Sequence, residues 1–180
     1  MAAERSLAVG VSYLGFADPG DGVPGTDFTQ LKTIEENSVV FNFSDNTTVN
    51  FRAEGMSDPW ASFDKAGDPD SVEFNIPSPT PDELKMLCGG TVTGNKWAAP
   101  TNIQNVRKTL KIQTTPYAGK FTEYIFTNCK VSAKINQAPN SEQTDLLMVR
   151  ASKMAAISEA GVQGDPWSRE VKTVESVPEG

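Results

Sequence analysis

The fold is decided by one stretch, Ser71-Val-Glu-Phe-Asn-Ile-Pro-Ser-Pro-Thr-Pro-Asp-Glu-Leu-Lys-Met-Leu-Cys-Gly-Gly90. In residues 71–76, apolar and polar side chains alternate, which is the period of a half-buried strand. From Thr80 the pattern changes, because a hydroxyl N-cap precedes proline and Glu83 occupies the capping-box position of a helix. The paired glycines that begin at Gly89 supply a helix stop. We therefore expect a strand followed by one short helix.

The rest of the chain has the pattern of strands separated by Gly- and Pro-rich loops. We predict a mainly β fold, a β-sandwich or partly closed barrel of about seven or eight strands, with one short flanking α-helix. The predicted domain spans 1–154 and includes an N-terminal arm, and 155–180 is predicted to be an extended C-terminal arm. The expected core face of the first strand is Leu7, Val9, Val11 and Tyr13. The expected strands are 7–16, a weaker 27–34, 38–43, 47–53, 71–76, 106–114, 121–127 continued by 129–135, and 144–152.

Strands 38–43 and 47–53 are expected to pair as a hairpin, because their apolar residues can face the same way across a short turn. The segment 54–70 that follows has no periodicity and contains two Asp-Pro pairs, so we predict a long loop. It carries Trp60 and Phe63, and exposed aromatic side chains of this size commonly anchor interfaces. The loop is therefore a candidate subunit interface.

Composition excludes several classes of function. The 180 residues carry a net charge of −7, which argues against general binding to nucleic acid or anionic membranes. No apolar run approaches the length of a membrane span, and the N-terminal residues lack a signal-peptide pattern, so residence in a cytosol is expected. Cys88 and Cys129 are expected to be buried free thiols.

Catalytic motifs are scarce. The chain has no histidine, which removes the usual general base and the commonest metal ligand. The glycine pairs lack the spacing of a phosphate-binding loop. Residues 64–70 slightly resemble a calcium loop but lack its closing glutamate and flanking helices. We expect no enzymatic activity, no cofactor and no metal.

Charge is unevenly distributed along the chain. Residues 54–83 hold eight acidic residues and one basic residue, and residues 96–134 hold seven basic residues and one acidic residue. Two ordinary solvated surfaces would account for this pattern. The alternative is electrostatic matching between copies of the chain, in which acids such as Asp58, Asp68 and Asp70 meet the basic stretch of a neighbour.

The order of these parts resembles a known family. The similarity covers roughly residues 7–152 and is carried by "LKTIEENSVVF", "VEFNIPSPTPDELKMLCGG", "RKTLKIQTTPYAGKFTEYIFTNCKVSAKI" and "TDLLMVRAS". Its most telling piece is "ELKMLCGG", followed by a Trp-containing loop and a basic strand. In this arrangement the chain resembles the major tail tube proteins of tailed bacteriophages and, through them, the tube proteins of type VI secretion and other contractile injection systems.

The resemblance implies a structural virion protein assembled in the cytoplasm of a bacterial host. Copies of the chain would form homohexameric rings that stack into a hollow tail tube for the passage of DNA. The implied partners are the chain itself and other tail proteins, such as the tape measure, the terminator and a sheath. The candidate interface residues are Trp60, Phe63, Asp58, Asp68, Asp70 and Trp167, the last in a C-terminal arm that we expect to dock on an adjacent subunit.

Two other functions fit the sequence. A carbohydrate- or receptor-binding β-sandwich could stack sugars on Trp60, Trp97 and Trp167. A capsid decoration, head-completion or tail-terminator protein of similar fold would share the architecture without forming a tube.

Overall fold

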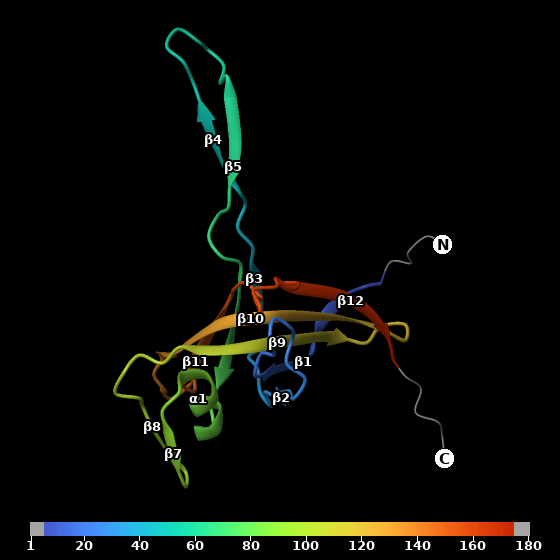
Figure 1. Cartoon of the computed structure of the whole chain (residues 1–180). Helices are drawn as coiled ribbons and strands as arrows, with labels where there is room; N and C mark the ends of the chain where they lie inside the picture. Colours follow the sequence, from blue (N-terminus) through green and yellow to red (C-terminus); the bar gives the residue numbers. More distant parts are fainter. Residues whose placement is uncertain (1–5, 175–180) are drawn as a thin grey trace.

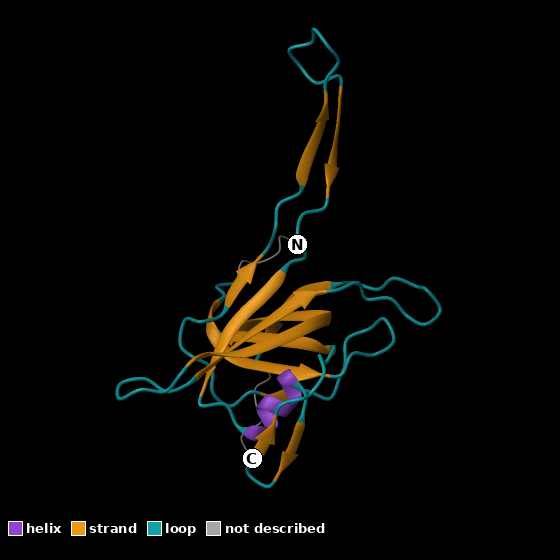
Figure 2. Cartoon of the chain, turned by 90° about the vertical axis from the view of Figure 1, so that its left-hand side faces the viewer, coloured by secondary structure: helices purple, strands orange, loops and turns teal. Residues whose placement is uncertain are grey.

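The computed structural model describes residues 6–174, drawn in Figures 1 and 2. The first residues of the predicted N-terminal arm, 1–5, and the last of the predicted C-terminal arm, 175–180, lie outside this range. In chain order the elements are β1 (Val9–Ala17), β2 (Thr29–Gln30), β3 (Val40–Asn42), β4 (Thr47–Phe51), β5 (Ala61–Lys65), β6 (Ser71–Pro77), α1 (Pro81–Cys88), β7 (Thr91–Thr93), β8 (Lys96–Ala98), β9 (Val106–Thr115), β10 (Lys120–Gln137), β11 (Leu146–Lys153) and β12 (Trp167–Thr173).

One antiparallel sheet forms the body of the molecule. Its strand order is β2-β1-β9-β10-β11-β6-β3, and β12 pairs with the first half of β10. The sheet curls around its core, because Phe16 on β1 and Phe74 on β6 lie with ring centroids 6.1 Å apart although three strands separate them in the sheet. The described strands do not close into a barrel. The predicted mainly β fold with one short helix is confirmed.

Helix α1 forms as the sequence predicts. Thr80 Oγ1 accepts a hydrogen bond from the Glu83 amide at 3.3 Å, and the Thr80 amide donates to Glu83 Oε2 at 2.8 Å, which completes a capping box. The helix buries Leu84 and Leu87 against the sheet. The largest fully buried apolar side chains of the core are Leu14, Phe16, Val72, Phe74, Ile76, Leu87, Leu110, Ile112, Phe126, Leu147 and Val149.

The expected core face of β1 is wrong. The register of β1 against β9 shifts between Val9 and Tyr13, around Gly10 at φ +65°. The irregularity inserts two residues into β1, so it leaves the alternation of faces unchanged, and Val9 and Tyr13 both lie on the outer face opposite Thr115 and Gln113. The residues of the other face, Leu14 and Phe16, pair with the buried Ile112 and Leu110 and enter the core in place of the predicted residues. The residues predicted for the core and found exposed are Leu7, Val9 and Val11.

The expected hairpin between 38–43 and 47–53 is also wrong. β3 pairs with β6 of the main sheet, whereas β4 pairs with β5, which lies inside the predicted long loop. Pairing in the sheet lets Phe41 reach Tyr124 and Phe126, with centroids 5.2 and 6.1 Å away. A local hairpin would not provide that contact, so long-range packing overrides the short turn.

Three further expectations change in detail. The loop expected over residues 91–105 begins with a small hairpin of β7 and β8. The weak strand expected at 27–34 reduces to the two residues of β2. The part of the expected C-terminal arm that the structure describes contains β12, which pairs with β10 of the same chain over Lys120–Phe126.

Candidate functional site

The hairpin of β4 and β5 projects away from the body of the molecule (Figures 1 and 2). Val49 pairs with Phe63 and Phe51 pairs with Ala61, so these four side chains share one face. The opposite face is polar, and there Thr48 Oγ1 donates to Asp64 Oδ1 at 2.7 Å. The hairpin is therefore amphipathic although it covers no core.

The apolar face of the hairpin remains open to solvent. Phe51, Trp60 and Phe63 are 44%, 67% and 53% exposed. They contact one another, with Phe51 centroids 5.7 Å from Phe63 and 6.3 Å from Trp60. A contiguous exposed aromatic cluster is typical of a surface that binds another molecule.

The root of the hairpin is fixed to the body. Asp70 accepts hydrogen bonds from the Ser44 amide at 3.1 Å and from the Lys153 ammonium on β11. The bond from Lys153 holds the pKa of Asp70 below its usual range. Residues 43–46 and 66–70 connect the hairpin to the body and form its stalk. The two segments of the stalk run so close together that a Cβ added at Gly67 would lie 2.4 Å from the Asp45 carbonyl oxygen. The hairpin is thus held at a defined point rather than attached by a free linker.

An aromatic cluster lies in the body below this root. Phe43 and Phe126 flank Trp167, at centroid distances of 5.5 and 5.7 Å, and the Phe126 and Trp167 rings are nearly parallel at 14°. Phe126 is 1% exposed and Trp167 is half-buried. Trp167 therefore packs partly within its own subunit, and its expected docking on a neighbour stays a prediction.

An ion pair also ties β12 to the sheet. Glu123 on β10 is 4% exposed and receives hydrogen bonds from Lys172 on β12 and from Gln113 on β9. Burial alone would raise the pKa of Glu123, but the two hydrogen bonds and the charge of Lys172 outweigh it and lower the pKa. The same hydrogen bond raises the pKa of Lys172. β12 is thus a paired strand of the body.

The structure brings some of the predicted interface residues together. Trp60 and Phe63 both contact Phe51, and Asp58 lies in the connection between β4 and β5, exposed. Asp68 is exposed in the stalk, whereas Asp70 is engaged by Lys153 and Trp167 lies in the body.

Phe51 belongs to the same surface, and Met56, which is 56% exposed, lies in the connection between β4 and β5; neither is among the predicted interface residues. The sequence signal for Phe51 is its alternation with Val49 in the expected strand 47–53. That strand was predicted to pair with residues 38–43, so its apolar face was not recognised as an exposed surface.

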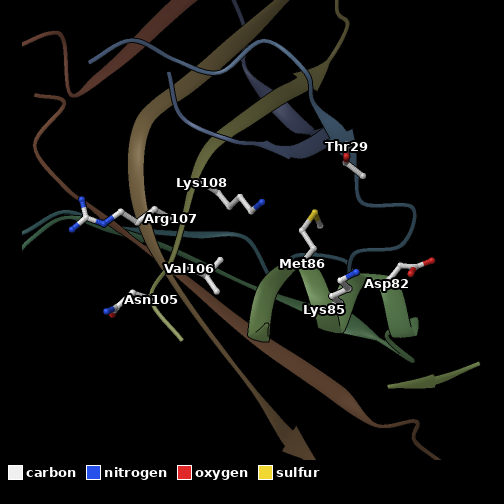
Figure 3. A pocket seen from close by; sticks show the side chains of 8 residues that line it. All are labelled: Thr29, Asp82, Lys85, Met86, Asn105, Val106, Arg107 and Lys108. Atoms are coloured by element: carbon white, nitrogen blue, oxygen red, sulfur yellow. The ribbon is translucent and has the colours of Figure 1, made fainter. Parts of the chain in front are cut away.

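A hollow of about 590 Å³ lies on the opposite side of the body, between α1, β2 and the start of β9 (Figure 3). Met86 and Val106 form its apolar part, and Lys85 and Lys108 reach towards it from α1 and β9. Lys108 also forms an ion pair with Asp18 at 2.6 Å, and Asp18 is 85% exposed. Arg107 lines the rim but points away from the other side chains in Figure 3.

The three tryptophans lie in different parts of the fold. Trp60 is on the hairpin, Trp167 is stacked on Phe126, and Trp97 on β8 donates a hydrogen bond from Nε1 to the Gly89 carbonyl at 2.9 Å. They do not form one stacking surface for a sugar, which weakens the carbohydrate-binding interpretation.

The cysteines are free thiols, as expected, although only Cys129 is fully buried and Cys88 is half-buried. Burial raises the pKa of Cys129 to about 12 and also raises the pKa of Cys88. Among residues 6–174, no group of three or more acidic or cysteine side chains is arranged to hold a metal ion. No helix in this range is long and apolar enough to cross a membrane.

No protein-family model matches this chain, and no curated protein matches it.

Proposed function

We propose that this chain is a structural protein of a bacteriophage tail, and that its copies form stacked hexameric rings of a tail tube that conducts DNA. The observation that carries the proposal is the β4–β5 hairpin, an ordered, amphipathic element whose aromatic face has no apolar partner among the described residues. If another copy of the chain covers that face, the aromatic side chains become buried and stabilise the contact.

Open sheet edges support assembly by strand pairing. β12 pairs only with β10, and β3 pairs only with β6, among the strands that the structure describes. Exposed edges of this kind tend to pair with other strands, and a ring that joins them removes the edge. Neighbouring sheets would then form a continuous wall around a channel.

The net charge suits the same role. Asp70 and Glu73 of the acidic stretch already pair with Lys153 and Arg150 on β11 of the same chain, so electrostatic matching between copies would rest on the other acids of the stretch. The net charge of −7 also limits adhesion of DNA, which has to slide through a tube without binding its wall. The proposed partners remain other copies of the chain, a tape measure, a terminator and a sheath, with the virion tail as the location.

Negative-stain electron microscopy of the concentrated protein tests the proposal. Tubes of stacked rings with a central channel are the expected result. Isolated rings that never stack would favour the alternative of a head-completion or tail-terminator protein. Protein that stays monomeric at every concentration and in the presence of a tape measure would overturn the proposal.

A further inference from the structure

We propose that the tip of the β4–β5 hairpin of one copy docks in the hollow beside α1 of a second copy. This inference rests on the proposed function, because it names the receiving surface of the assembly contact. Two surfaces of opposite charge and matching apolar character carry it, together with their positions at opposite ends of the molecule.

The tip, residues 52–60, presents apolar and acidic groups together. Met56 and Trp60 are 56% and 67% exposed. Glu54 and Asp58 are exposed beside them, and within the described part of the chain neither carboxylate has a hydrogen bond or ion pair. Arg52 is exposed in the same segment, so the tip carries one net negative charge, and its apolar surface and both carboxylates are available.

The hollow complements the tip, because three of its lining side chains are basic (Lys85, Arg107 and Lys108) and one is acidic (Asp82). Met86 and Val106 are half-buried and supply apolar contact area, and a methionine side chain adapts readily to an incoming aromatic ring. Lys85 is exposed and forms no ion pair within residues 6–174. The Lys108 side chain is 20% exposed, and within residues 6–174 its ion-pair partner is Asp18, which is 85% exposed. The Lys85 ammonium can therefore receive a carboxylate from outside the subunit directly, and the Lys108 ammonium can do so by sharing its contact with the exposed Asp18.

Geometry places the two surfaces for head-to-tail contact. In both whole-chain views the hairpin projects from one end of the body, and α1 lies at the other end (Figures 1 and 2). A protrusion at one end that fits a hollow at the other forms a heterologous interface, which extends into stacks or filaments. A tip cannot reach the hollow of its own subunit, so the contact has to be made by another copy.

Charge reversal tests the contact. The tip variant carries Glu54→Lys and Asp58→Lys, the hollow variant carries Lys85→Glu and Lys108→Glu, and a third protein carries all four substitutions. We expect each pair alone to raise the concentration needed for assembly by about tenfold or more, because attraction becomes repulsion. The combined protein should return towards the wild-type value. Assembly is followed by light scattering and sedimentation, and circular dichroism confirms folding.

Matched controls separate this contact from general charge effects. Glu142→Lys with Glu159→Lys changes the net charge as much as the tip variant does, at exposed sites outside the hairpin. A hollow variant with Lys85→Glu alone avoids any loss of the Lys108–Asp18 ion pair. Both tip and hollow variants should differ from the control pair.

The outcomes distinguish this inference from the proposed function. If wild-type protein assembles and the combined protein assembles no better than either variant, the receiving surface is wrong but the tube proposal stands. If wild-type protein never assembles, the proposed function is wrong, and the docking contact that rests on it is wrong as well. Recovery in the combined protein, with the control pair unaffected, establishes the contact.

Discussion

The main sheet and the β4–β5 hairpin both contain phenylalanine side chains, but such side chains are buried only in the sheet. In the sheet, Phe16, Phe74 and Phe126 are each 1% exposed, whereas Phe51 and Phe63 on the hairpin are 44% and 53% exposed. Both regions pair their strands in antiparallel register. Strand formation alone therefore does not explain the aromatic residues of the hairpin.

The difference indicates where each region gains its stability. Burial of a large apolar side chain contributes about 1.5–3 kcal/mol, and the sheet obtains this within one chain. An isolated two-stranded hairpin is marginally stable in water, so the aromatic face of β4–β5 would gain that contribution only from a partner. We therefore expect substitutions in the two regions to separate folding from assembly.

The largest effect is expected in the sheet. Phe126→Ala should lower the free energy of unfolding by about 3–5 kcal/mol, because it leaves a cavity beneath Trp167. Phe63→Ala on the hairpin should change it by no more than about 0.5 kcal/mol. Urea denaturation of the monomers measures both. Equal losses would mean that the hairpin belongs to the folding core.

The hairpin pair Trp60→Ser and Phe63→Ser should leave a folded monomer that cannot polymerise. The physical reason is that both rings are more than half exposed in the single chain, so little burial is lost on folding. Sedimentation measures assembly, and Thr48→Ser with Ser62→Thr on the polar face serves as the control. Normal tubes from the Trp60/Phe63 variant would contradict the assigned role of the hairpin.

A smaller effect is expected at Trp167. Because this side chain is half-buried in its own subunit, Trp167→Ala should cost about 2 kcal/mol of unfolding free energy, less than truncation of a fully buried ring. Thermal and urea unfolding are the measurements. A monomer of unchanged stability that fails to assemble would instead favour docking of β12 on a neighbour.

The two aspartates of the stalk form a matched pair. Asp70→Asn should cost about 1 kcal/mol, since it weakens the contacts with Lys153 and Ser44, and Asp68→Asn should cost almost nothing. The same denaturation experiment compares them. If Asp68→Asn were the more damaging for folding, the stalk would be anchored differently from the structure.

The smallest effect concerns pH. The pKa of Glu123 is lower in the folded chain than its ordinary value of 4.5, so its ion pair stabilises the fold above that pH. This contribution is lost as the pH falls through the lowered folded pKa. Glu123→Gln should therefore be less stable than wild type at neutral pH, and the two unfolding free energies should converge in acid. Parallel curves from pH 7 to pH 3 would contradict the assignment.

Local signals predicted some parts of the fold and missed others. The helix at Pro81–Cys88 and the strand before it were predictable, because capping residues and alternation act within a few residues. The pairing of β3 was not, since it depends on contacts between Phe41 and Tyr124, which are far apart in sequence. β12 was missed because only Trp167 and Val171 mark its apolar side.

For the candidate site, residue type was more informative than position. Trp60 and Phe63 were identified because large aromatic residues in an acidic segment are conspicuous, although that segment contains a strand rather than a loop alone. The role of Asp70 could not be anticipated, since Lys153 reaches it from 83 positions away in the sequence. The hollow beside α1 combines α1, β2 and β9, and no local pattern brings these elements together.

Hydrogen exchange in monomeric and assembled protein tests the central claim most directly, that another copy completes the β4–β5 hairpin. Amides of β9 and β10 lie in the interior of the sheet and should be protected in both states. Amides of 47–65 should exchange rapidly in the monomer and become protected when the protein assembles. Equal, rapid exchange of the hairpin in both states would contradict the account.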